Sequence, residues 1–308
     1  MSGEVRKSIY GKDKLHEIVE VFIHQLETGV PCWLKPYSGS GQWSIPQNYL
    51  TRRNYRGLNV LHLWGVMEQH GYESPYFLSY KQARQMNAHV KKGEKGHQII
   101  FWEMKESKEA EASEETGEIS HYWFTRVYTV FHISQVEGLT EPAIEQELPA
   151  AFRYKRVDDF VRRTGIRCLV RAGAMPSYSV GKDVIMMPPI REFHSQEEYI
   201  VAKLHELGHA SGAKQRLNRL EQCKFGDQIY AFEELTVELC AAFLGAHFGV
   251  PIRKVQHAEY LNHWVNALRA KPQILWSASS KAQAAFDYLL RLGGEDVPFE
   301  QEPLAVNQ

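Results

Sequence analysis

The chain has few cysteines, and none of them form a paired motif. The four residues, Cys32, Cys168, Cys223 and Cys240, contain no C-x-x-C pair and follow no regular spacing. This pattern gives no sign of a disulfide framework or of a cysteine-rich zinc site. It is typical of reduced thiols in a cytoplasmic protein.

The sequence also lacks the apolar segments that would place it at a membrane. Residues 1–14 are polar and charged, without the apolar core of a secretory signal. The nearest candidate for a membrane span, Leu239 to Val250, is too short and contains His247. We therefore expect a cytoplasmic protein with no membrane partner.

No charge of one sign dominates, since the net charge is −1, but the charges are unevenly distributed. Residues 1–105 hold 14 Lys and Arg against 9 Asp and Glu, whereas residues 106–150 hold 2 against 10. With 308 residues the chain is long enough for two domains. We predict a domain over 1–140, an acidic linker over 141–150, a second domain over 151–295 and a tail over 296–308.

The most informative segment reads HExxH and begins at His205. On an α-helix, positions i and i+4 lie one above the other, so His205 and His209 can present two imidazoles to one zinc ion. Glu206 would lie beside the open position of the metal, where it can activate metal-bound water as a general base. The alternative is a solvated helix with two surface histidines. Against it, Ser195 begins a capping-box sequence, which predicts a helix that carries both histidines and ends near Gly212.

A catalytic zinc site needs a third protein ligand, and the next helical segment, residues 231–247, offers three glutamates. We predict Glu234 as the ligand because it shares a face with small residues that let two helices approach. Glu238, one turn further on, suits a hydrogen bond to the far nitrogen of a ligand histidine. Glu233 points about 100° away and is the weaker candidate; a solvated carboxylate face is the alternative. Tyr230 is a candidate oxyanion donor, although a core position is more common for such a phenol.

Two β-hairpins are expected. Residues 177–180 and 184–187 flank a Gly-Lys-Asp turn and predict one of them. A strand just before an HExxH helix commonly forms the edge of the cleft, to which an extended peptide can add, but an ordinary hairpin is equally compatible with this pattern. Residues 98–102 and 121–131 predict the second hairpin, with the acidic residues 103–118 as its flexible tip.

Aromatic and basic residues alternate in the N-terminal region. Proteins that bind single-stranded DNA combine cations that follow the phosphates with rings on which bases stack. Tyr49 and Tyr55 are the candidate stacking residues. The candidate phosphate contacts are Arg52, Arg53, Arg56, Lys91, Lys92 and Lys95. The alternative is an aromatic core with solvated charges around it.

Several motifs, in order along nearly the whole chain, resemble one family. They are the run Pro46 to Asn59, the segments Tyr80 to Ala83 and Val90 to Gly96, the segment Asp183 to Pro189, the HExxH motif, and the segments Tyr230 to Glu238 and His257 to Trp264. Together they resemble the ArdC-type antirestriction proteins, whose N-terminal domain also occurs in plasmid primases. The resemblance implies a single-stranded DNA-binding domain followed by a zincin-like metallopeptidase domain, in a protein that mobile elements carry to protect incoming DNA from restriction.

Carried over to this chain, the family's metal site is His205, His209 and Glu234, with Glu206 as general base. The chain departs from the family where Ala210-Ser211-Gly212 replaces a common Trp-Thr-Gly. We expect zinc binding to survive this change and the shape of the cleft beside the metal to differ.

The sequence thus favours an α+β protein that binds single-stranded DNA through its first domain and carries a gluzincin-like zinc metallopeptidase centre in its second. Two alternatives remain open. In one, the protein shields DNA and its metal is structural or vestigial. In the other, it is a peptidase whose protein substrate is itself bound to DNA.

Overall fold

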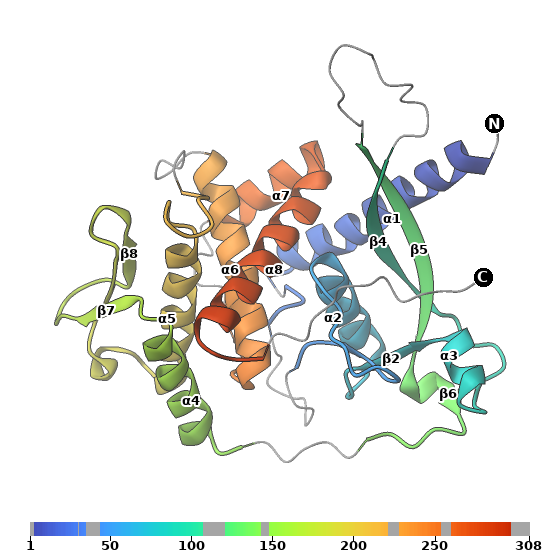
Figure 1. Cartoon of the computed structure of the whole chain (residues 1–308), viewed down its shortest axis with the longest axis horizontal. Helices are drawn as coiled ribbons and strands as arrows, with labels where there is room; N and C mark the ends of the chain where they lie inside the picture. The colour runs from blue at the N-terminus through green and yellow to red at the C-terminus, as the bar shows by residue number, and fades with distance from the viewer. Residues whose placement is uncertain are drawn as a thin grey trace, which may run out of the picture.

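The computed structural model contains both helices and small sheets, which confirms the expected α+β class (Figure 1). The structure describes residues 3–29, 31–34, 44–106, 121–142, 148–220, 228–253 and 260–296. Residues 107–118 of the expected hairpin tip, 143–147 of the expected acidic linker and 297–308 of the expected tail lie outside these residues. Residues 103–106, which we expected in the flexible tip, instead continue the first strand of the hairpin.

The N-terminal half contains a four-stranded sheet in the order β1-β2-β5-β4, in which β1 is parallel to β2 and the other pairs are antiparallel. Its strands are β1 (Gln47–Asn48), β2 (Tyr76–Ser79), β4 (His97–Glu106) and β5 (His121–His132). Strands β4 and β5 pair from His97 opposite Val130 to Glu106 opposite His121, which confirms the predicted second hairpin. Two helices accompany this sheet, α1 (Gly3–Glu27) and α2 (Leu58–His70).

A small lobe completes this half. It consists of α3 (Tyr80–Gln85) and the antiparallel pair β3 (His89–Val90) and β6 (Val136–Glu137). The side chain of Ser79 accepts a hydrogen bond from the Gln82 amide and thereby caps α3. The lobe has its own apolar cluster, made of Tyr49, Leu78, Ala83, Ala88, Ile133 and Val136.

The C-terminal half places a three-stranded sheet beside a group of helices. Its elements are α4 (Ala150–Arg163), β7 (Arg167–Val170), β8 (Ser177–Ser179), β9 (Val184–Met187), α5 (Gln196–Ser211), α6 (Gln228–Phe248), α7 (Leu261–Ala270) and α8 (Gln273–Leu292). The predicted pairing of β8 with β9 is confirmed. Of the two interpretations left open for this pair, the structure favours the ordinary hairpin, because β7 pairs in parallel with the other side of β9 and leaves β9 with no free edge for an added peptide.

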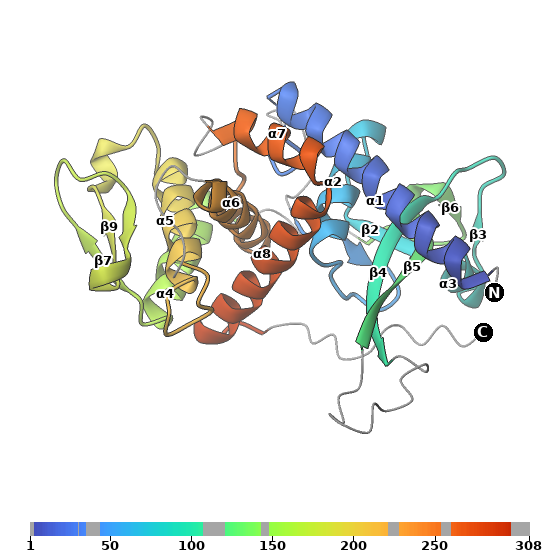
Figure 2. The same cartoon turned by 90° about the horizontal axis from the view of Figure 1, so that it is seen from above.

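Helices α5 and α6 pack closely against each other, and Figure 2 shows them side by side with α8. Gly208 on α5 permits this approach, because a Cβ built at Gly208 would lie 2.9 Å from Cγ1 of Val237 on α6. The serine predicted to start α5 does so, since the side chain of Ser195 accepts a hydrogen bond from the Glu198 amide. Within the described residues, no helix is both long and apolar enough to cross a membrane.

The two halves share one apolar core. Trp64 of α2 lies with its ring 5.9 Å from that of Phe243 of α6, centroid to centroid, and α1 packs against α7. At the same boundary Arg56 forms an ion pair with Asp287 of α8. The amide of Gly57 donates to the Gln283 side chain, also on α8, at 2.9 Å. The N-terminal and C-terminal halves are therefore joined by a shared apolar core as well as by the acidic segment between them.

Candidate metal centre

Helix α5 carries the HExxH motif in its last two turns, with Gly212 as its C-cap. His205 and His209 both lie on the side of α5 that faces α6, and their ring centroids are 4.9 Å apart. Both side chains are buried, at 1% and 8% exposed. Burial of two imidazoles at helical spacing does not fit a solvated helix, which was the alternative interpretation of this motif.

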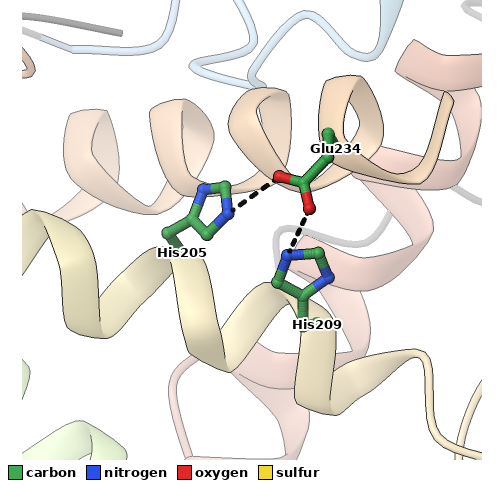
Figure 3. A group of neighbouring side chains, drawn as sticks. All are labelled: His205, His209 and Glu234. Carbon is green, nitrogen blue, oxygen red and sulfur yellow. Dashed lines mark ion pairs between the residues drawn. The ribbon is translucent and has the colours of Figure 1, made fainter. Parts of the chain in front are cut away.

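Glu234 of α6 completes a group of three side chains that could hold a metal ion. Its two carboxylate oxygens face the two histidines, with Oε2 3.3 Å from Nε2 of His205 and Oε1 3.3 Å from Nε2 of His209 (Figure 3). One ligand atom from each residue lies within 4.8 Å of the other two. Two imidazole nitrogens and one carboxylate oxygen, with no sulfur, fit Zn²⁺ or another divalent transition metal.

The charges of this group are strongly coupled in the protein without a metal. Burial alone would lower the pKa of His205, but its hydrogen bond to Glu234 and the charges of Glu238 and Glu206 outweigh burial and raise the pKa to about 9. Burial alone would raise the pKa of Glu234, but its contacts with both histidines hold that pKa far below its usual value. The group thus stabilises positive charge beside its carboxylates, which is the condition a cation needs.

Two further side chains border the group. Glu206 is 5% exposed, and it lies near enough to His205 and Tyr230 for its charge to act on both. Burial raises the pKa of Tyr230 well above its usual value, and a hydrogen bond with Glu234 raises it further. The phenol of Tyr230 therefore keeps its proton, so that it can act as a hydrogen-bond donor beside the candidate ligand.

Each histidine has a second carboxylate near it. Glu238 is fully buried, and its charge raises the pKa of His205. Glu233 lies with Oε1 3.9 Å from Nδ1 of His209. The sequence indicated Glu238 for a supporting role, but it gave no reason to pair Glu233 with His209.

The N-terminal residues that are candidates for DNA contact divide into exposed ones and ones that are buried or half-buried. The exposed ones are Arg52, Arg53, Lys91, Lys92 and Lys95. The guanidinium of Arg52 lies over the rings of Tyr49 and Tyr76, at 4.8 Å and 4.7 Å from their centroids.

The remaining three are engaged within the protein. Tyr55 is 6% exposed and belongs to the shared core, so the expectation that it stacks on a base needs correction. Tyr49 is 9% exposed, and its hydroxyl donates to the carbonyl of Thr140. Arg56 is half-buried in its ion pair with Asp287. Aromatic residues between basic ones look alike in sequence whether they face a ligand or a core.

Comparison with known proteins matches both halves of the chain. Residues 12–131 match the family described as the N-terminal domain of anti-restriction factor ArdC, and residues 155–281 match zincin-like metallopeptidases. The crystal structure of the metal-free antirestriction ArdC protein from plasmid R388 is 32% identical, with a TM-score of 0.76 over 91% of this chain and 97% of that one. The chain belongs to the ArdC family. The Mn(II)-bound structure of the same R388 protein is 31% identical to this chain, with a TM-score of 0.75 and the same coverage.

Two other relatives extend the family. An uncharacterized protein, y4eC of Sinorhizobium fredii (strain NBRC 101917 / NGR234), is 34% identical over 90% of this chain and 91% of its own length. A DNA primase TraC from Escherichia coli is 32% identical over 91% of this chain, which spans only 20% of that much longer protein. The zincin-like half and the Mn(II)-bound relative together indicate a divalent metal for this ArdC family member.

Two residues near these sites escaped the sequence analysis. Arg219, in the segment after α5, is buried beside the metal group and contacts Glu233. No local pattern marks it, because its partner is 14 residues away on another helix. Tyr80 begins α3 and is 55% exposed, which makes it better placed than Tyr55 to meet a ligand. The capping box of Ser79 and Gln82 could have marked Tyr80 as the first residue of a helix, but the exposure of its ring is known only from the structure.

Proposed function

We propose that this chain is an antirestriction protein of a mobile element that binds single-stranded DNA and carries a zinc peptidase centre formed by His205, His209 and Glu234. The observation that supports the centre is the convergence of two imidazoles from α5 and one carboxylate from α6, with ligand atoms within 4.8 Å. Of the metals compatible with such donors, Zn²⁺ is the one most often bound by an HExxH helix and a third carboxylate.

The roles follow from the chemistry of the side chains. His205, His209 and Glu234 would hold the ion, which when bound polarises a carbonyl and lowers the pKa of water. Glu206 accepts the proton of the attacking water on its carboxylate and returns it to the leaving amine. Burial raises the pKa of Tyr230, so its phenol stays protonated. The phenol can then donate a hydrogen bond that stabilises the negative charge developing on the carbonyl oxygen of the cleaved peptide bond.

The DNA-binding role is assigned to the exposed cations of the N-terminal half. Arg52, Arg53, Lys91, Lys92 and Lys95 are solvent-exposed and could contact phosphates without breaking a buried ion pair. Tyr80 replaces Tyr55 as the candidate ring for base stacking, because Tyr80 is exposed and Tyr55 belongs to the core. Such contacts bind single strands with little dependence on base sequence.

A second candidate is that the metal has a structural role and that protection comes from coating DNA. The burial of His205 and Glu234, at 1% and 0% exposed, favours it, because an ion there would join α5 to α6. If the centre does act on a peptide, a protein bound to the same DNA is the substrate that the N-terminal half would bring to it.

The variant Glu206→Gln tests these candidates. It removes the base and preserves the size of the side chain and the three ligands. If the centre is a peptidase, Glu206→Gln should lose antirestriction activity in cells, while the purified variant retains one divalent ion per chain. Full protection by Glu206→Gln with the ion retained would contradict the peptidase and favour shielding.

DNA binding needs a separate measurement, because the two roles are assigned to different parts of the chain. In fluorescence titrations with a single-stranded oligonucleotide, Arg52→Ala/Arg53→Ala should lower the salt slope by about 0.7 for each phosphate that is no longer neutralised. The matched control is Arg167→Ala/Arg171→Ala, which removes two exposed arginines near the β7–β9 sheet. Equal slopes for wild type and both variants would exclude Arg52 and Arg53 from the DNA interface.

A further inference from the structure

Arg219 is a buried cation whose hydrogen bonds reach both helices of the metal centre. Its side chain is 7% exposed, and it forms a two-point contact with Glu233 of α6, which is 3% exposed. Nη2 donates to Oε1 at 3.0 Å and Nε donates to Oε2 at 3.2 Å. A guanidinium matches a carboxylate in this fork geometry, which fixes the orientation of the carboxylate as well as its charge.

The same guanidinium holds the end of α5. Nη2 also donates to the carbonyl of Gly208 at 2.9 Å, and Nη1 donates to the hydroxyl of Ser211 at 3.1 Å. These two residues flank His209. A Cβ at Gly212 would lie 3.0 Å from Nη2, so the glycine at the C-cap leaves room for the arginine. Gly212 is in the right-handed region, with a φ of −82°, so close approach rather than backbone conformation explains the glycine.

Glu233 lies next to the nitrogen of His209 that does not face the metal group. Nε2 of His209 is 3.3 Å from Glu234, whereas Nδ1 is 3.9 Å from Oε1 of Glu233. The two nitrogens of one imidazole therefore face two successive glutamates of α6. A carboxylate beside the outer nitrogen of a ligand histidine keeps the proton there and leaves the inner nitrogen free to bind metal.

Charge explains why the arginine is needed. Four buried carboxylates, Glu206, Glu233, Glu234 and Glu238, lie at or beside the two histidines. A buried carboxylate without a compensating charge is costly, and one with free oxygens would compete for the metal. Because both oxygens of Glu233 accept from Arg219, this carboxylate is compensated and directed away from the coordination sphere.

We propose that Arg219 and Glu233 are a positioning pair that orients His209 for metal binding and leaves Glu234 as the carboxylate ligand. This inference rests on the proposed metal centre. It assigns no contact with substrate to either residue. It predicts that metal affinity depends on a residue in the segment after α5, outside both ligand helices.

The experiment compares the full chain with four variants: Glu233→Gln, Arg219→Gln, Arg219→Lys and the double variant Glu233→Gln/Arg219→Gln. Zn²⁺ and Mn²⁺ affinities are measured by competition with a chelator, and the visible spectrum of the Co²⁺-loaded protein reports ligand geometry. The single Gln variants should bind metal about 10- to 100-fold more weakly, the range found when outer hydrogen bonds to ligands are removed. The double variant should be no worse than the poorer single one, because the two residues act together.

Two controls separate positioning from loss of stability. Asp158→Asn removes the carboxylate that accepts from the buried Lys203 of α5 at 2.6 Å, on the side where α4 packs, and should leave metal affinity and the Co²⁺ spectrum unchanged. Arg219→Lys keeps the charge but loses the fork, so it should fold and show an intermediate affinity.

The outcomes discriminate between the two levels of proposal. If the wild type binds metal, Glu234→Ala abolishes binding, and both Glu233→Gln and Arg219→Lys keep wild-type affinity and spectrum, the positioning pair is refuted while the metal centre stands. A wild type that binds no divalent ion would refute the metal centre, and the positioning pair with it. Weaker binding with an altered Co²⁺ spectrum in the Glu233 and Arg219 variants, but not in Asp158→Asn, supports the pair.

Discussion

Replacing Gly208 by alanine should separate the two helices that carry the metal ligands. The new Cβ would lie 2.9 Å from Cγ1 of Val237, which is well inside van der Waals contact. Val237 is fully buried and β-branched, so it cannot rotate away at low cost on a helix. The helices must therefore move apart by a substantial fraction of an ångström.

The expected magnitude combines two opposing effects. Overpacking a core typically costs about 1–3 kcal/mol. Alanine in place of glycine within a helix contributes about 1 kcal/mol in the other direction. We expect Gly208→Ala to lower the free energy of unfolding by about 0–2 kcal/mol and, more clearly, to weaken metal binding, because ligand groups must be held to within about 0.5 Å.

Val237→Ala supplies the matched second variant. Alone it should destabilise the protein by creating a small cavity. Combined with Gly208→Ala it removes the clash, so the double variant should regain metal affinity and be more stable than the sum of the single changes implies. The measurements are denaturant unfolding and chelator competition. Additive stabilities together with unchanged metal affinity in Gly208→Ala would show that the α5–α6 contact does not set the ligand geometry.

Three other predictions concern separate parts of the molecule. Burial lowers the pKa of His132, whose Nε2 donates to the Ser74 carbonyl at 2.9 Å. The unfolded chain therefore binds more protons than the folded one as the pH falls below about 6.5, and the free energy of unfolding falls with the pH. His132→Gln should flatten this pH dependence in denaturant unfolding, and a profile parallel to that of the wild type would contradict the assignment. Asp287→Asn removes the charged partner of Arg56 at the boundary of the halves. The uncompensated half-buried guanidinium should lower the free energy of unfolding by about 1–3 kcal/mol, measured by thermal or denaturant unfolding, and no change would mean that the ion pair does not stabilise the boundary. A divalent ion at about 100 times its Kd should raise the free energy of unfolding of the wild type by about 2.7 kcal/mol relative to the protein in excess chelator. The same ion should leave Glu234→Ala unchanged, and the shift in unfolding temperature in a calorimetric scan measures both.

The parts of the site that the sequence could predict are those that local rules determine. The cap at Ser195 and the spacing of His205 and His209 define one helix and one ligand face. The same periodicity on α6 separated Glu234 from Glu233, and the structure brings Glu234 to both histidines.

What escaped prediction depends on contacts between distant segments. Arg219 lies in an irregular segment, and its partners on α5 and α6 become neighbours only after the helices pack. Tyr55 was misjudged because its neighbours in sequence are polar, whereas its neighbours in space include Phe77. The shared core was missed for a related reason, since a change in charge along the chain carries no information about which apolar faces meet.

The shared core also bears on how the chain matures during synthesis. Helices α1 and α2 are made first, but their partners α7 and α8 begin about 200 residues later than α2. At about 5–20 residues per second, α2 is synthesised on the order of 10–40 s before its partner α8, and α1 precedes its partner α7 by a still longer interval. The apolar faces that these helices share with α7 and α8 are therefore buried only after the C-terminal helices have been synthesised.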